Sequence, residues 1–406
     1  MKKQFVKILS LCVLGAITIF VSCNKDDDEI VPDNNGTNVV NTDSIARADS
    51  IARADSIARI DSIAKADSIA RADSIAKIVA QPIRKVFILN EGSWGGNNST
   101  LDMYYPDSVT LCKKKIFAAA NGYGLGDTGQ DLLAYGNRIY VSVWGSNYLA
   151  KLDVNGKIVE KHEFTADEGQ PRYLAAKDGF IYVSTYADAV LKFDTTSLAA
   201  SIGKVSVGSN PEGIAVAGNN LIVCNSTKDY VNDNRISVID LATFTLKKNL
   251  ETEFSNFQSA VAVGDSVYVT YYTPAYAVEM LNVDVAAGTV KRSGAATKMA
   301  VYNDKLYCAN SATVYDADWN ATTNTNFFVR DVKAGTDTEI LDLTSTPELK
   351  TATVYLFEID PDNGDIYVGT TDYVTNGVIY RFGQDGKLIT KFETSGVSPN
   401  TAAFVK

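Results

Sequence analysis

A short strand pattern recurs seven times between residues 86 and 369, and no other feature limits the possible fold as strongly. Each copy is a run of four residues rich in β-branched and aromatic side chains, next to turn residues such as Asp178-Gly179. The copies are Val86-Phe87-Ile88-Leu89, Ile139-Tyr140-Val141-Ser142, Ile181-Tyr182-Val183-Ser184, Leu221-Ile222-Val223-Cys224, Val267-Tyr268-Val269-Thr270, Leu306-Tyr307-Cys308-Ala309 and Ile366-Tyr367-Val368-Gly369. This repetition predicts an all-β protein built from one repeated unit.

Further strands surround each copy. A second strand often ends in an apolar residue and an aspartate, as in Leu152-Asp153, and a third follows a Gly-Lys turn, as in 156–159. Another apolar strand precedes the copy, as in 171–175. Four strands in every 40–50 residues, roughly, are typical of propeller blades. A sandwich and a β-helix are the alternative folds.

The two ends of the repeat region predict how the ring closes. The first unit begins at Val86 without a preceding strand, and residues 398–405 have the form of that missing strand. The chain end therefore completes the first blade and leaves no sheet edge open at the ring closure. We predict a seven-bladed β-propeller of four-stranded blades over residues 83–406.

The first residues indicate export and lipid attachment. Lys2, Lys3 and Lys7 precede an apolar run, and small Ser22 stands before Cys23. This arrangement is typical of a secretory signal over residues 1–22, and it resembles a bacterial lipobox with Cys23 as the lipidated residue. An ordinary signal peptide with an incidental cysteine is the alternative. Residues 23–42 begin with an acidic run that resembles the export signal of surface lipoproteins from Bacteroides-like bacteria, or is a solvated charge run.

Residues 43–80 form a low-complexity stalk with a period of six. Each repeat places an Asp four residues before a Lys or Arg, as in Asp49 and Arg53, and this spacing supports a helix. Six residues advance a helix by about 240°, so the isoleucines spread over three faces and form no coiled-coil seam. We expect a single, partly helical spacer, with disorder as the alternative. The Asp-Ser-Ile triplets resemble acceptors for O-glycans, which predicts modification of Ser44, Ser50, Ser56, Ser62, Ser68 and Ser74.

Composition excludes several functional classes. The formal net charge of −10 argues against nucleic acid and against anionic membrane surfaces as partners. Besides Cys12 and Cys23, three widely spaced cysteines remain, and Cys224 and Cys308 lie within apolar strands as core residues. We expect contact with a membrane only through the N-terminal lipid.

Residues for catalysis are scarce. His162 is the single histidine, it is flanked by charges, and we expect an isolated surface residue. Cysteine and histidine show no metal-binding spacing, and residues 360–365 resemble a calcium loop less than a plain turn. These observations predict a protein that is not an enzyme, with no cofactor and no metal.

An aromatic rim is the strongest indication of function. All three tryptophans follow one of the repeated strands, in connections that open on one face of a propeller. The connection over residues 309–326 is the longest, and we expect it to lie over that face like a lid. Aromatic planes interleaved with amide and charged groups suit a large amphipathic ligand, although tyrosines on loops can merely pack the loops down. The predicted ligand-binding residues are Trp94, Asn97, Asp127, Gln130, Trp144, Tyr148, Arg172, Tyr186, Glu212, Tyr230, Tyr272, Trp319 and Tyr373.

Residues 83–406 resemble the YVTN-type bacterial repeat propellers, and more closely the propeller lipoproteins on the surface of gut Bacteroides. The segments that carry this resemblance are 89–92, 98–101, 121–130 and Pro171-Arg172-Tyr173, including an Asn-Glu-Gly and a Gly-Asp-x-x-Gln element. Some members capture cobalamin for an outer-membrane transporter. The resemblance thus implies a lipid-anchored outer-membrane protein facing the exterior, with a corrinoid as candidate ligand and a TonB-dependent transporter as candidate partner. A glycan-binding or adhesion protein of the cell surface is the alternative.

Overall fold

The computed structural model describes residues 42–80, 84–108, 112–264, 266–315, 318 and 321–406. The chain divides into two compact units, 1–81 and 82–406. The signal segment and Cys23 lie outside the described residues. No described helix combines the length and the apolar composition needed to cross a lipid bilayer.

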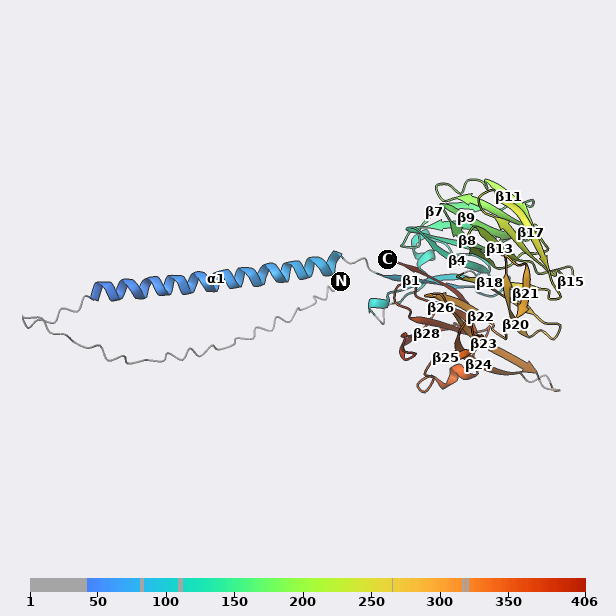
Figure 1. Ribbon diagram of the computed structural model, residues 1–406. Helices are drawn as coiled ribbons and strands as arrows, with labels where there is room; N and C mark the ends of the chain where they lie inside the picture. Colours follow the sequence, from blue (N-terminus) through green and yellow to red (C-terminus); the bar gives the residue numbers. More distant parts are fainter. Residues whose placement is uncertain (1–41, 81–83, 109–111, 265, 316–317, 319–320) are drawn as a thin grey trace, which may run out of the picture. The chain divides into compact units, whose positions relative to one another are not determined.

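The described part of the first unit is one helix, α1 (Thr42–Ala80) (Figure 1). Its 39 residues extend over about 58 Å at the rise of an α-helix. Isoleucines on different faces, such as Ile51, Ile57 and Ile60, are all more than half exposed. The described part of the stalk is therefore a helix without an apolar seam, as predicted, and its role as a spacer stays a prediction.

The second unit is a propeller of seven four-stranded sheets. Each blade is listed from its inner strand outward. Blade 1 consists of β30 (Pro399–Val405), β1 (Lys85–Asn90), β2 (Thr100–Tyr104) and β3 (Cys112–Lys113). Blade 2 consists of β4 (Gly129–Tyr135), β5 (Arg138–Val143), β6 (Tyr148–Leu152) and β7 (Ile158–Glu163), and blade 3 of β8 (Pro171–Lys177), β9 (Phe180–Thr185), β10 (Ala189–Asp194) and β11 (Gly203–Ser206). Short helices η1 (Pro106–Ser108) and α2 (Ile116–Asn121) lie near β3 in the chain.

Blades 4 to 7 repeat this order. Blade 4 consists of β12 (Ile214–Ala217), β13 (Asn220–Cys224), β16 (Arg235–Asp240) and β17 (Thr245–Glu251), and blade 5 of β18 (Phe257–Val263), β19 (Ser266–Tyr272), β20 (Val278–Asp284) and β21 (Thr289–Arg292). Blade 6 consists of β22 (Lys298–Tyr302), β23 (Lys305–Tyr315), β24 (Ala321–Arg330) and β25 (Asp337–Glu339), and blade 7 of β26 (Thr353–Ile359), β27 (Ile366–Thr371), β28 (Val378–Phe382) and β29 (Leu388–Glu393). A small hairpin, β14 (Thr227–Lys228) and β15 (Val231–Asn232), extends one loop of blade 4, and η2 (Pro347–Lys350) precedes blade 7.

The seven repeated runs are the second strands of the seven blades, as predicted. Side chains on both faces of these strands are buried because each sheet packs against both of its neighbours. One apolar cluster fills each of the seven blade interfaces. The inner strands of successive blades contact one another around the ring. They thereby surround the central channel of a propeller.

The C-terminal strand closes the ring as predicted. Strand β30 pairs antiparallel with β1, from Lys85 opposite Val405 to Leu89 opposite Thr401, and the chain end lies beside β1 (Figure 1). Arg381 of blade 7 reinforces the closure. It donates to Asp365 of its own blade and to the Tyr104 hydroxyl and the Pro106 carbonyl of blade 1.

Two local expectations are wrong. Most of the connection predicted as a lid is strand, because β23 and β24 pair in register from Leu306 opposite Arg330 to Tyr315 opposite Ala321. His162 is buried rather than a surface residue. Its Nε2 lies 3.2 Å from Glu168 Oε2, and its ring packs against Phe164 and Phe193. Cys224 and Cys308 are buried in the core as expected.

Candidate functional site at the channel mouth

Five of the predicted residues meet at one end of the channel, where blades 2, 3 and 4 adjoin. They are Gln130, Trp144, Arg172, Tyr186 and Glu212, and we call them the Arg172 cluster. Gln130 and Arg172 lie at the start of inner strands β4 and β8, Glu212 lies just before β12, and the two aromatic residues follow β5 and β9. The inner strands begin at this face, and the loops between second and third strands lie on it as well. Residues far apart in the chain therefore converge there.

Hydrogen bonds fix the Arg172 side chain in the cluster. Its Nε and Nη2 donate to Glu212 Oε2 at 2.9 and 2.7 Å, and its Nη1 donates to Gln130 Oε1. Tyr186 donates its hydroxyl to the other oxygen of Glu212. The Arg172 and Glu212 side chains are only 15% and 8% exposed, so this ion pair is largely removed from water.

Aromatic rings surround the guanidinium. Arg172 Cζ lies 4.9 Å from the Tyr186 ring centroid and 5.7 Å from that of Trp144, and the two rings meet edge to face at 6.3 Å. Cation–π contacts of this kind add to the ion pair where water is excluded. The Trp144 Nε1–H is buried and has no hydrogen-bond partner among the residues that the structure describes. A buried donor without a partner is costly, and a bound ligand is one way to satisfy it.

The charges of the cluster reinforce one another. Burial opposes the charge on Arg172, but Glu212, Tyr186 and Tyr173 together outweigh burial and keep the pKa of Arg172 above its ordinary value. Burial and the Glu212 charge together raise the pKa of Tyr186. The same two causes raise the pKa of Tyr272, a predicted residue at the end of β19. Tyr272 therefore belongs to the electrostatic surroundings of the cluster.

A second group at the mouth contains one predicted residue, Tyr373, beside Tyr355, Glu91 and Lys298, which were not predicted as site residues. Tyr355, on inner strand β26, donates its hydroxyl to Glu91 and packs edge to face against Tyr373 at 5.8 Å. Lys298 Nζ of inner strand β22 lies 4.8 Å from the Tyr355 ring centroid. Burial raises the pKa of Glu91, while Tyr355, Lys298 and Arg172 oppose that rise. This group therefore adjoins the Arg172 cluster electrostatically.

Ionisable groups also line the channel below the mouth. Burial raises the pKa of Asp131 to about 6 and, together with the Asp131 charge, raises the pKa of Glu358 to about 8. Burial lowers the pKa of Lys298, although the nearby carboxylates oppose this. All three side chains keep part of their surface accessible, as expected for groups that are enclosed by protein but line a channel. The sequence signal for them is their shared place on inner strands.

The other predicted residues lie apart from the Arg172 cluster. Trp94 is 82% exposed, in a loop with Asn97, and Asp127 Oδ2 accepts from the Gly95 N–H of that loop at 3.0 Å. Tyr230 is fully exposed at the tip of the β14–β15 hairpin, and Tyr373 is 59% exposed. Trp319 lies outside the described residues.

Tyr148 corrects one prediction. Its ring is buried, its hydroxyl donates to the Leu125 carbonyl, and Lys161 Nζ lies 4.5 Å from its ring centroid. These contacts assign Tyr148 to packing between blades, where it presents no free face to a ligand.

Comparison with known proteins adds the family. Residues 84–398 match the family described as "Domain of unknown function (DUF5074)". The chain belongs to this family. No curated protein matches it.

Several solved structures share the fold of the DUF5074 protein. Hydrazine synthase of Kuenenia stuttgartiensis is 17% identical with a TM-score of 0.53, over 68% of this chain and 89% of that one. A putative 6-phosphogluconolactonase of Bacteroides fragilis is 12% identical with a TM-score of 0.55, over 79% and 98%. The Pan2 WD40 domain of Neurospora crassa is 11% identical with a TM-score of 0.51, over 66% and 81%. At these identities the likeness concerns the fold alone.

Proposed function

We propose that this DUF5074 propeller is a binding protein, not an enzyme, and that it takes its ligand at the channel mouth. The Arg172 cluster carries the proposal. Its polar groups are already held in place by one another, and its aromatic rings form part of the wall. The Trp144 Nε1–H is a buried donor without an acceptor in the described part of the chain. A site that is organised before binding loses little conformational entropy when the ligand arrives.

The mouth suits a large, amphipathic ligand with many hydrogen-bonding groups, and a corrinoid such as cobalamin is the candidate. Apolar planes are provided by Trp144, Tyr186 and Tyr355, and both signs of charge are provided by Arg172, Lys298 and the carboxylates beside them. Sites of this class combine mostly apolar walls with a few placed polar groups. The resemblance to corrinoid-capturing surface propellers points to the same ligand class.

The proposed setting is the outer face of the outer membrane. There the chain is anchored through a lipid on Cys23, with α1 as a spacer, and it passes the ligand to a TonB-dependent transporter. The exposed helical stalk is consistent with a spacer that holds the propeller away from a surface. Metabolic labelling with a fatty acid in the native host, lost on Cys23→Ala, tests the anchor separately from the ligand.

Calorimetric titration of the purified protein with cyanocobalamin and with cobinamide tests the ligand. We expect one-to-one binding, at least about tenfold weaker in Trp144→Ala, because that change removes an aromatic wall and the buried donor. Trp94→Ala is the matched control, since it removes a tryptophan that lies outside the Arg172 cluster. Absence of heat with both corrinoids at several hundred micromolar would eliminate this ligand class.

A glycan is the second candidate ligand, favoured by one observation. Tyr230, Tyr276 and Tyr373 present exposed rings at loops of three blades, and each has a positive φ of 60–65°. Bulky residues rarely adopt this conformation, and it persists where the surrounding structure enforces it, often at functional sites. Binding on a glycan array that is lost in Tyr276→Ala would support this candidate, and a blank array would contradict it.

A further inference from the structure

Blade 6 carries a strand edge that its neighbours lack. Strands β23 and β24 pair along their whole length, but β25 pairs with β24 only at Phe328, Val329 and Arg330. Within the described residues, the stretch of β24 from Ala321 to Phe327 therefore has β23 as its sole strand neighbour. Figure 1 shows this hairpin projecting from the propeller.

The direction of the backbone groups along this edge follows from one hydrogen bond. The Phe327 carbonyl accepts from the Ile340 N–H at 3.2 Å, on the side away from β23. Backbone groups alternate sides along an antiparallel strand, so those of Thr325 and Thr323 also point away from β23. The opposite pair agrees, because the Ala309 carbonyl and the Ser311 N–H face Thr297, which lies just before the neighbouring strand β22. Thr323 and Thr325 thus direct backbone donors and acceptors toward the outer edge; Thr323 is half-buried there and Thr325 is 8% exposed.

Residues 321–326 carry none of the sequence features that usually prevent an edge from pairing. Natural sheets guard their edges with charged residues, proline, bulges or a covering segment. Residues 321–326, Ala-Thr-Thr-Asn-Thr-Asn, contain no charge and no proline, and the pairing with β23 is regular throughout. Threonine also favours the extended conformation. The composition of this edge therefore permits a further strand to add to it.

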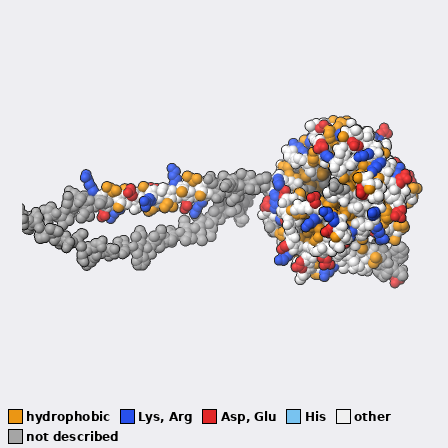
Figure 2. Space-filling model, in the orientation of Figure 1, with side chains coloured by type: hydrophobic (Ala, Val, Ile, Leu, Met, Phe, Trp, Pro, Cys, Tyr) orange, Lys and Arg blue, Asp and Glu red, His pale blue; other side chains and the backbone are white. Residues whose placement is uncertain are grey.

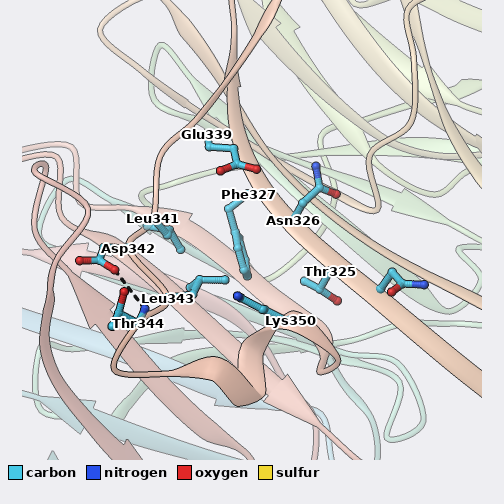
Figure 3. Close-up of a pocket in the computed structure, with 10 residues that line it drawn as sticks. Thr325, Asn326, Phe327, Glu339, Leu341, Asp342, Leu343, Thr344 and Lys350 are labelled. Atoms are coloured by element: carbon cyan, nitrogen blue, oxygen red, sulfur yellow. Dashed lines mark hydrogen bonds between the residues drawn. The ribbon is translucent and has the colours of Figure 1, made fainter.

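A pocket of about 480 Å³ adjoins the edge (Figure 3). Its apolar side chains are Phe327, Leu341 and Leu343, and the Phe327 ring points into its centre in Figure 3. Three charged residues, Glu339, Asp342 and Lys350, stand around it and are exposed. None of these three forms an ion pair within the part of the chain that the structure describes. Carboxylates outnumber the lysine, so the rim favours a basic group.

We propose that the outer edge of β24 binds an extended peptide segment of a partner protein. The segment adds as a strand beside Thr323 and Thr325, places one apolar side chain in the pocket, and brings a lysine or arginine to Glu339 and Asp342. In this binding mode the backbone hydrogen bonds supply affinity, and the pocket supplies specificity. The proposal does not depend on the ligand at the channel mouth.

The test is a displayed library of random seven-residue peptides, selected on the wild-type protein and counter-selected on Thr323→Pro. Proline at 323 removes an edge donor and blocks an approaching strand, yet it leaves the pairing with β23 intact because that N–H points outward. Thr313→Pro is the matched control. Thr313 lies directly opposite Thr323, and its N–H points to the other edge of the same hairpin.

We expect enriched peptides to carry a central apolar residue next to a lysine or arginine. Synthetic copies should bind the wild type and Thr313→Pro alike in fluorescence anisotropy, and bind Thr323→Pro at least about tenfold more weakly. Leu343→Ala should weaken binding several-fold, and bound peptide should slow hydrogen exchange at Thr323 and Thr325. Circular dichroism and thermal melting establish that each variant is folded.

Two results would overturn the proposal. One is a selection in which no peptide distinguishes the wild type from folded Thr323→Pro. The other is a wild-type protein that sediments as a dimer at micromolar concentration while Thr323→Pro sediments as a monomer. In that case a second copy of the chain occupies the edge.

Discussion

Glu212→Gln is the most direct test of whether the mouth is organised before a ligand binds. Gln has the shape of Glu but no charge, so the substitution leaves the Arg172 guanidinium enclosed without its counter-ion. It also turns one of the two oxygens that accept from Arg172 and Tyr186 into a donor. Gln also removes the cost of burying a carboxylate, but the uncompensated charge of Arg172 outweighs that gain, so the folded state is destabilised.

The size of this loss of stability follows from the burial of the Arg172–Glu212 ion pair. Breaking a fully buried ion pair costs about 3–5 kcal/mol, and the 15% and 8% exposure of these two side chains reduces the expected cost to roughly 2–3 kcal/mol. For a propeller of this size, the unfolding entropy converts that loss into a fall in Tm of about 4 °C. Differential scanning calorimetry of the ligand-free protein at pH 7 measures it.

The chain contains a matched control at the surface. Glu348 also accepts from a cation and a tyrosine, Lys391 at 3.0 Å and Tyr380 at 3.1 Å, but its side chain and that of Lys391 are 44% and 51% exposed. Water replaces such contacts easily, so Glu348→Gln should cost less than about 1 kcal/mol. Equal shifts in Tm for the two variants would refute the claim that the Arg172 cluster is a desolvated, preorganised unit.

Three further predictions test the channel, the ring closure and the stalk. Glu358 has a pKa raised to about 8 in the folded protein, above its unfolded value of about 4.5. Its contribution to stability is therefore full at low pH and is lost as the pH rises from the unfolded to the folded pKa. Glu358→Gln should raise Tm over the wild type at pH 9 more than at pH 5, and an equal gain at both pH values would contradict the raised pKa. Removal of residues 399–406 deletes the inner strand of blade 1 and should abolish cooperative unfolding in calorimetry. The control is removal of Lys406 alone. This exposed residue pairs with Asp362, and its loss should change Tm by less than about 2 °C. Mass spectrometry of the protein from its native host should show glycan mass in the stalk that is lost when all six predicted acceptors, Ser44, Ser50, Ser56, Ser62, Ser68 and Ser74, are replaced by Ala. An unmodified wild-type stalk would refute the predicted acceptors.

The fold was predictable because its signal is local and repeated. Each repeated strand is a continuous apolar run next to its own turn residues, so the seven copies could be aligned within the sequence. The ring closure followed from the form of residues 398–405 and needed no knowledge of distant contacts. The outer part of the blade 6 hairpin was missed because Thr and Asn occupy residues 322–326 of β24, which leaves no hydrophobic pattern there.

The site was only partly predictable, since its contacts join residues far apart in the chain. Arg172 and Glu212 are 40 positions apart, and Glu91 and Tyr355 are 264 apart. Position within the repeat placed the first pair on the correct face. Nothing local distinguishes Tyr355 from the tyrosines that pack inside blades, or shows that Tyr148 is buried and Tyr186 is not. These differences arise from packing between neighbouring blades.

The two proposed sites can be separated experimentally because they share no residue. The Arg172 cluster belongs to blades 2 to 4. Lys298, also at the mouth, belongs to the inner strand of blade 6, whereas the peptide edge is the third strand of that blade. Energetic effects of distant, unconnected positions are usually additive. Glu212→Gln should therefore leave peptide binding at β24 unchanged, and Thr323→Pro should leave ligand binding at the mouth unchanged. Loss of both functions in either variant would mean that the propeller had unfolded, or that ligand and partner communicate through the ring, and a normal melting curve would decide for communication.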